Sequence, residues 1–253
     1  MRKVVMDPVH MALLLAAGVG AGFCNAIAGG GSLLSFPALL AFGLPPVSAT
    51  VTNAVAVWPG YLGGAAALRK RATDYRNLLP RLVITGTVGA VGGVLMLLAA
   101  PPAVFAALVP YLVLGATALF AAQPWISRKL SARQSDSQVM LFAGVFLGGA
   151  YGAYFNGGMG IVLLTALALG LDASAQLLNG LKSVLTVAVS TTAMIAVALF
   201  GPVHWVAVAL LAPACLLGGV LGAKFADRLQ PKVFRYVVIA FGATAGTAML
   251  LTA

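Results

Sequence analysis

Long apolar stretches separated by short polar loops make up almost the whole chain of 253 residues. Most stretches approach the roughly 20 residues that an α-helix needs to cross the hydrocarbon core of a bilayer. The pattern therefore predicts an all-α polytopic membrane protein. The apolar segments cover approximately residues 10–28, 31–44, 48–68, 78–99, 103–122, 139–155, 157–171, 174–200, 203–223 and 233–252.

Glycine-rich breaks interrupt this pattern at two places. Residues 28–32 read AGGGS and residues 156–160 read NGGMG. Glycine is a poor helix former, and lipid cannot satisfy the backbone polar groups that it exposes, so each break must be buried in protein or line a cavity. We therefore expect a transported solute to bind at the two breaks.

The segments that follow the breaks, 31–44 and 157–171, are too short to cross a bilayer alone. A helix of about 14 residues covers about 21 Å, against a hydrocarbon thickness of roughly 30 Å. Each short segment is predicted to pair with the preceding one as a broken or re-entrant unit. Counting such a pair as one span gives eight membrane segments, and counting its members separately gives ten.

The chain also divides into two similar halves. The polar stretch 123–138, predicted to be a cytoplasmic linker, separates a first membrane repeat at 1–122 from a second at 139–253. A shift of 126 residues matches SATVTN, which ends at Asn53, with SAQLLN, which ends at Asn179. The motif GGVL recurs at the same shift, which indicates a duplication.

Loop charges predict how the halves are oriented. Lys and Arg crowd the loops 69–81 and 224–235, whereas the equivalent loops of the other half, 201–204 and 99–103, contain neither. Because positive loops stay in the cytoplasm, equivalent loops should lie on opposite faces, with both termini outside. The sequence therefore predicts an inverted-topology repeat, the architecture of many secondary transporters.

Composition narrows the class of partner. The chain is 61% hydrophobic and 8% charged, with a mean hydropathy of +1.03 and a net charge of +10. Because the basic residues stand in loops beside apolar spans, they fit the lipid bilayer rather than a nucleic acid. The chain has no Glu, two His, two Cys and no recognised metal-binding spacing, so neither enzyme activity nor a cofactor is expected.

Two stretches resemble a known family. AGGGSLLSFPALLAFGLPPVSATVTNA at 28–54 and FNGGMGIVLLTALALGLDASAQLLNGLKSV at 155–184 are similar to the paired signatures of the TauE/SafE sulfite exporter family, also called the toluene sulfonate uptake permeases. The resemblance implies a multi-pass permease of the bacterial inner membrane. It also implies that the substrates are small sulfur-containing anions such as sulfite or organosulfonates.

Lys182 is the only Lys or Arg well inside a predicted span. A charge at the membrane centre costs about 2.5–3.5 kcal/mol unless it meets water or an anion. Asn179, Ser183 and Thr186 share its helix face by their spacing, so this face is expected to line a hydrated path. The alternative is that Lys182 snorkels or contacts backbone carbonyls.

The backbone at the breaks can add further donors. Helices that start after Gly31 and Gly158 would present unpaired amide N–H groups, which suit an oxyanion. We expect the two breaks to approach each other near the bilayer midplane, although a buried Asn or Ser can equally serve as an interhelical hydrogen-bond partner. The expected substrate-binding residues are Asn25, Gly29, Gly30, Gly31, Ser32, Asn53, Asn156, Gly157, Gly158, Asn179, Lys182, Ser183 and Thr186.

Together these patterns predict a secondary permease that moves sulfite or an organosulfonate by alternating access, with export as the favoured direction. A passive anion channel and a transporter of a non-sulfur organic anion are the alternatives. Protons as the coupling ion and a homo-oligomer both stay open.

Overall fold

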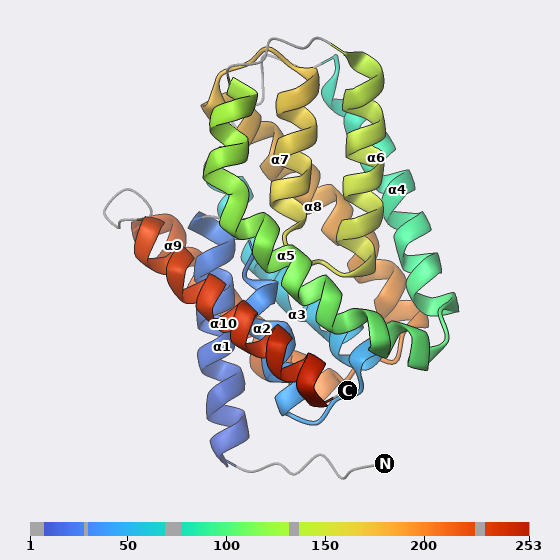
Figure 1. The fold of residues 1–253 in the computed structure, drawn as a ribbon, viewed down its shortest axis with the longest axis vertical. Helices are drawn as coiled ribbons and strands as arrows, with labels where there is room; N and C mark the ends of the chain where they lie inside the picture. Colours follow the sequence, from blue (N-terminus) through green and yellow to red (C-terminus); the bar gives the residue numbers. More distant parts are fainter. Residues whose placement is uncertain (1–7, 28–29, 69–76, 132–136, 226–230, 253) are drawn as a thin grey trace.

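The computed structural model describes the chain except for residues 1–7, 28–29, 69–76, 132–136, 226–230 and 253. This described part forms ten α-helices, and each predicted apolar segment is confirmed as a helix (Figure 1). The helices are α1 (Pro8–Ile27), α2 (Ser32–Ala41), α3 (Pro46–Leu68), α4 (Leu79–Ala99), α5 (Pro102–Ser131), α6 (Gln138–Tyr154), α7 (Met159–Gly170), α8 (Ala175–Phe200), α9 (Trp205–Phe225) and α10 (Pro231–Thr252).

Helix α5 is longer than the sequence predicts. The apolar segment ends at residue 122 and a linker is expected at 123–138, but the helix continues to Ser131. The apolar residues end where the membrane-facing surface ends. The helix itself continues, because Lys and Arg are good helix formers. The first part of the predicted linker is therefore helical.

Helices α6 and α7 form an antiparallel hairpin around the second break. A Cβ added at Gly152, near the end of α6, would meet the side chain of Met159 at the start of α7. One added at Gly144, two turns earlier, would meet Ala166 near the end of α7. The reversed order shows that α7 folds back along α6.

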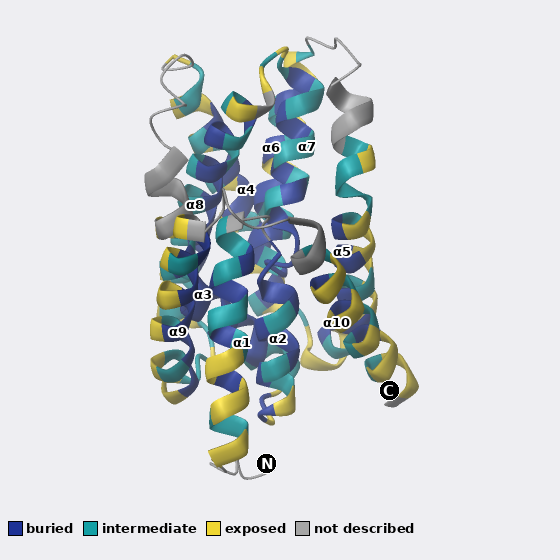
Figure 2. Cartoon of the chain, turned by 90° about the vertical axis from the view of Figure 1, so that its left-hand side faces the viewer, coloured by how far each residue is buried: buried dark blue, intermediate teal, exposed yellow. Residues whose placement is uncertain are grey.

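Helices α1 and α2 form a similar turn around the first break. Gly31, just before α2, lies against the backbone of Ala21 in α1, and Leu34 lies against Gly20. Helix α2 has 10 residues and α7 has 12, so they cover only about 15 and 18 Å. The α1–α2 turn occupies the lower part of the molecule and the α6–α7 hairpin the upper part, so both breaks lie at middle height (Figures 1 and 2).

The most extensive helix contacts join the two halves of the sequence. Helices α1 and α3 pack on α9, α6 and α8 pack on α4, and α3 also packs on α8. We call the group α1, α2, α3 and α9 the first-break body, and the group α4, α6, α7 and α8 the second-break body. Each body takes one helix from the other half of the chain, so helices of the predicted repeats 1–122 and 139–253 are interleaved in the packing.

Glycines make the closest contacts inside each body. A Cβ added at Gly93 of α4 would overlap the carbonyl oxygen of Ala150 in α6. A Cβ added at Gly218 of α9 would likewise overlap the carbonyl oxygen of Val19 in α1. The missing side chains let the helix backbones touch, which is how helices associate in lipid.

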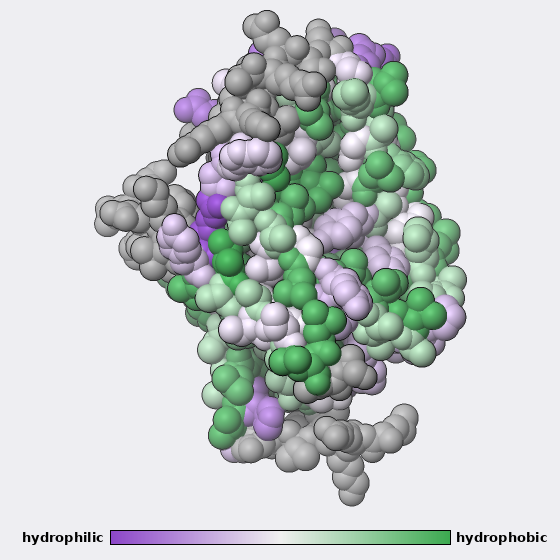
Figure 3. All heavy atoms as spheres, viewed as in Figure 1, coloured by the Kyte–Doolittle hydropathy of each residue, from purple (hydrophilic) through white to green (hydrophobic). Residues whose placement is uncertain are grey.

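The outer surface is apolar where that of a soluble protein would be polar. Helix α4 exposes Ile84, Val88 and Leu95, of which Ile84 is 63% exposed, and buries Gly86 and Gly93. On the face in Figure 3, strongly hydrophilic atoms lie near the margins. Among the described residues, five helical stretches are long and apolar enough to cross a membrane: Pro8–Ala26, Leu79–Ala99, Pro102–Ile126, Gln176–Phe200 and Trp205–Gly222.

Gly93→Ala should destabilise the protein, because the new methyl group must push α6 away from α4. Overpacking of this kind costs about 1–3 kcal/mol, and the apparent melting temperature in detergent should fall. The control is Gly92→Ala, since nothing lies within 4 Å of a Cβ at Gly92. Equal melting temperatures for the two variants would contradict the close contact between α4 and α6.

Candidate functional site

The first break is held by a side chain of α1. The Gly31 amide N–H donates to Oδ1 of Asn25 over 2.7 Å. One of the expected backbone donors is therefore already paired, and Asn25 acts as a cap for the start of α2. Gly30, with φ of 96°, lies against the ring of Phe120 in α5.

The second break contains two residues with left-handed backbone. Asn156 has φ of 67° and Gly158, which precedes α7, has φ of 75°. Ala116 of α5 lies within 4 Å of the Cβ positions of Gly157 and Gly158. Since Ala116 and Phe120 are one helical turn apart, α5 covers both breaks with one face.

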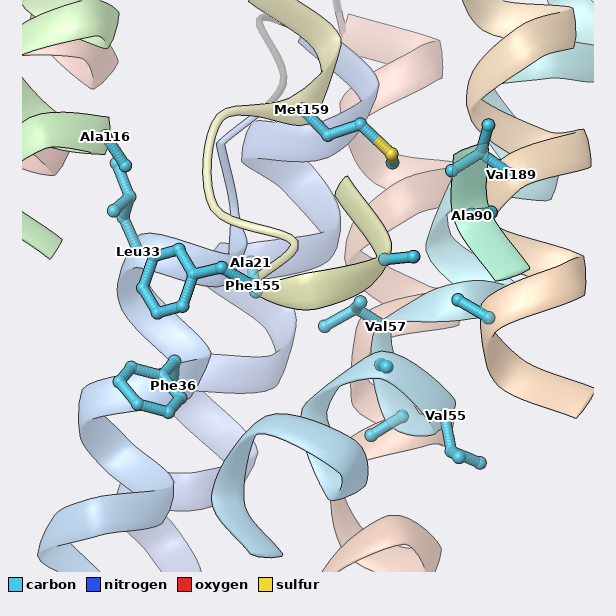
Figure 4. Close-up of a cluster of buried hydrophobic side chains, with 14 of the residues drawn as sticks. Ala21, Leu33, Phe36, Val55, Val57, Ala90, Ala116, Phe155, Met159 and Val189 are labelled. Carbon is cyan, nitrogen blue, oxygen red and sulfur yellow. The ribbon is translucent and has the colours of Figure 1, made fainter. Parts of the chain in front are cut away.

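The two breaks meet around Tyr61 of α3. Its hydroxyl donates to Oδ1 of Asn156 over 3.1 Å. The side chains of Ser32 and Asn25, from the first break, lie beside the same hydroxyl. Close by, the ring of Phe155 meets that of Phe36 edge-on, with centroids 5.4 Å apart (Figure 4).

Tyr61 is absent from the expected site, although the sequence holds a signal for it. It follows Asn53 by eight residues, a little over two turns of α3, which keeps both residues within one broad side of the helix. Asn53 is fully buried, and its Oδ1 accepts from the Ser35 hydroxyl over 2.6 Å. Ser35 lies in the first turn of α2, so Asn53 also faces the first break.

Lys182 lies beside the second break. Its Cδ is 3.8 Å from the Cβ position of Gly160, in the first turn of α7. Its ammonium donates to Oδ1 of Asn179 over 3.2 Å, and the Ser183 hydroxyl donates to the Asn179 carbonyl over 2.8 Å. Asp172, the one acidic residue in the described part, is exposed in the loop before α8.

Five buried polar atoms around this region make no hydrogen bond within the described part of the chain. They are Nδ2 of Asn25, Nδ2 of Asn53, and the hydroxyl oxygens of Ser32, Thr186 and Ser190. Hydroxyls elsewhere in the helices, such as those of Thr117 and Thr192, donate to the carbonyl one turn earlier. The five atoms are therefore free to meet a solute or water.

The expected residues thus form two neighbouring groups. Asn25, Gly30, Gly31, Ser32, Asn53 and Asn156 gather around Tyr61 and the start of α2. Asn179, Lys182 and Ser183 stand beside the start of α7, with Thr186 one turn further along α8. Gly29 lies outside the described residues. No group of His, Cys, Asp or Glu that could hold a metal occurs among the residues described.

Comparison with known protein families places the chain in one family. The sequence model described as "Sulfite exporter TauE/SafE" matches residues 14–249. The chain belongs to this family. It is a TauE/SafE membrane transporter, which confirms the resemblance of its two glycine-rich stretches.

Similar family members carry transporter names. "Probable membrane transporter protein" of Haemophilus influenzae is 29% identical over 242 residues, or 90% of each chain. "Probable membrane transporter protein ORF9" of Sinorhizobium is 33% identical over 117 residues, 45% of this chain and 44% of its own. "Probable membrane transporter protein YfcA" of Escherichia coli K12 is 28% identical over 151 residues, 59% of this chain and 55% of its own. No solved structure matches this TauE/SafE chain.

Asn156→Ala should destabilise the transporter more than Asn156→Gly. Both variants lose the hydrogen bond from Tyr61, but only alanine is strained at a φ of 67°. The left-handed backbone should lower the free energy of unfolding of the alanine variant by about 1 kcal/mol more. Thermal unfolding of the two purified variants checks this, and a lower melting temperature for the glycine variant would contradict it.

Proposed function

We propose that the chain is a secondary permease that carries a small sulfur-containing oxyanion, sulfite or an organosulfonate, across a bacterial inner membrane by alternating access. The family description supports sulfur chemistry. The chemistry of the two breaks supports an anion, as the following contacts explain. Export is the favoured direction because the family description names an exporter.

The observation that carries the proposal is the nature of the unpaired buried groups. The Nδ2 atoms of Asn25 and Asn53 can only donate, and the hydroxyls of Ser32, Thr186 and Ser190 each have a proton to give. The unpaired atoms of this region include no carboxylate or amide oxygen within the described chain. The two amide nitrogens cannot coordinate a cation, and all five groups can donate hydrogen bonds to the oxygen atoms of an oxyanion.

Lys182 supplies the positive charge for the same substrate. Its described hydrogen bond goes to the neutral Asn179, so its charge is not balanced by that partner. An ammonium has three N–H groups, and those not used for Asn179 can donate hydrogen bonds to a bound anion. Cotransport of a proton as a protonated anion such as bisulfite requires no acidic side chain in the spans.

The opposed hairpins favour alternating access. In this proposal each hairpin enters from its own side of the membrane, as an inverted repeat requires, with the positive loops inside and both termini outside. The moving units are the first-break and second-break bodies rather than the sequence halves. Rocking one half against the other would separate α1 from α9 and α4 from α6, where backbones are in contact.

Lys182→Ala should abolish or strongly reduce sulfite counterflow in proteoliposomes. A hydrogen bond to a charged group contributes about 1.5–3 kcal/mol, so affinity should fall about 10- to 100-fold. The control is Lys224→Ala, because Lys224 is exposed at the end of α9. Unaltered transport by Lys182→Ala would remove Lys182 from the site.

The wild-type protein tests the carrier mechanism in the same assay. An alternating-access carrier should show counterflow of labelled sulfite or sulfonate. Conductance far above carrier rates, without counterflow, would instead identify a passive anion channel. Counterflow confined to carboxylates would contradict the sulfur assignment.

Membrane-impermeant thiol labelling of intact cells tests the orientation. Cysteines placed at Arg81 and Lys224, both exposed, should be protected because their loops are cytoplasmic, whereas one at the exposed Ala103 should react. The native Cys24 and Cys215 are buried and should give little background. Labelling of Arg81→Cys and Lys224→Cys from opposite faces would refute the inverted arrangement.

A further inference from the structure

We propose that Tyr61 is a ligand of the transported anion, and that the anion competes with Asn156 for the proton of the tyrosine hydroxyl. This inference rests on the proposed function. It adds a residue that neither the family description nor the sequence pattern assigns to the site. It also names the event by which substrate binding changes the contact between the two bodies.

The groups around the Tyr61 hydroxyl can form an anion-binding site. We call the site formed by Ser32, Asn25 and the Tyr61 hydroxyl the anion seat. Ser32, with 2% of its surface exposed, lies beside it with an unpaired hydroxyl. Asn25 lies on the same side. Its Oδ1 accepts from the Gly31 amide, and its Nδ2 is unpaired. Both groups stand at the start of α2, where the positive end of the helix dipole favours an anion. An oxyanion at this point would accept hydrogen bonds from Ser32, Asn25 and Tyr61 together.

Tyr61 must change partner to join that seat. A tyrosine hydroxyl has one proton, and in the structure it goes to Oδ1 of Asn156. Ser32 and Asn25 belong to the same body as Tyr61, while Asn156 lies at the break of the second-break body. When the hydroxyl turns to the anion, the hydrogen bond between the two bodies is lost.

A second contact between the bodies is left in place. The Trp58 indole N–H donates to the Thr191 hydroxyl over 2.8 Å. Trp58 precedes Tyr61 by one turn of α3 and Thr191 belongs to α8, so this bond also joins the bodies but lies outside the anion seat. Substrate binding therefore loosens the contact at the breaks and leaves α3 hinged on α8. This couples the anion to the movement that alternating access needs.

The test is a double-mutant cycle on sulfite binding to the purified full-length protein. Tyr61→Phe should weaken sulfite binding about tenfold, the value of one hydrogen bond, in the Asn156→Gly background, and by less in the wild type, where the hydroxyl gives up its bond to Asn156 when it turns to the anion. If Tyr61 only holds the two breaks together, Tyr61→Phe will have no effect on affinity once Asn156 is glycine. That outcome would overturn the inference. Tyr151→Phe, which removes the hydroxyl of a tyrosine in α6, is the matched control and should bind as the wild type does.

Ser32→Ala keeps the inference testable if Tyr61→Phe does not fold. The Ser32 hydroxyl makes no hydrogen bond in the described chain, so its removal should leave the unliganded melting temperature unchanged or higher. Sulfite affinity should nevertheless fall about tenfold. Wild-type sulfite affinity in Ser32→Ala would contradict the assignment of Ser32 to the anion seat. Failure of the wild-type protein to bind sulfite or any sulfonate would instead overturn the proposed function itself.

Discussion

The fold depends on keeping two stretches of non-helical backbone away from lipid. A break in a membrane helix exposes amide and carbonyl groups that hydrocarbon cannot satisfy. Here the breaks turn toward each other at middle height, and one face of α5 closes over both through Ala116 and Phe120. Asn25 and Tyr61 then pair with polar groups at the breaks. The same enclosure buries the donors of the candidate site, so the structural constraint and the candidate site lie in one place.

The sequence predicts the helices well because crossing a membrane is a local property. Ten apolar runs become ten helices in the described part, and the two short ones do follow the glycine breaks. The packing of those helices is not local. Residues 92 and 93 are adjacent and both are glycine, yet only a Cβ at Gly93 would meet a carbonyl oxygen. Which glycine touches a neighbour depends on helix rotation, so the interleaving of the halves could not be predicted from the pattern.

The candidate site was predictable where a residue stands out from its apolar surroundings. Asn53, Asn156 and Lys182 do so, and the structure places each beside a break. Tyr61 was missed because aromatic residues in a membrane helix usually serve packing or the interface. The equivalence of Asn53 and Asn179 also hides a difference, since one meets α2 and the other meets Lys182 in its own helix. Positions that the repeat pattern predicts to be equivalent have different partners.

The interleaving of the two bodies has a consequence for biosynthesis. Helix α1 leaves the ribosome before α9, and the glycine surface of α9 against which it packs is made almost 200 residues later. Until then the carbonyl groups of Val19 and its neighbours must face lipid or a temporary partner. Helix α4 likewise waits for α6, across the middle of the chain. Insertion can therefore proceed helix by helix, whereas tertiary assembly must wait for α9, so neither half is equipped to fold as an independent unit.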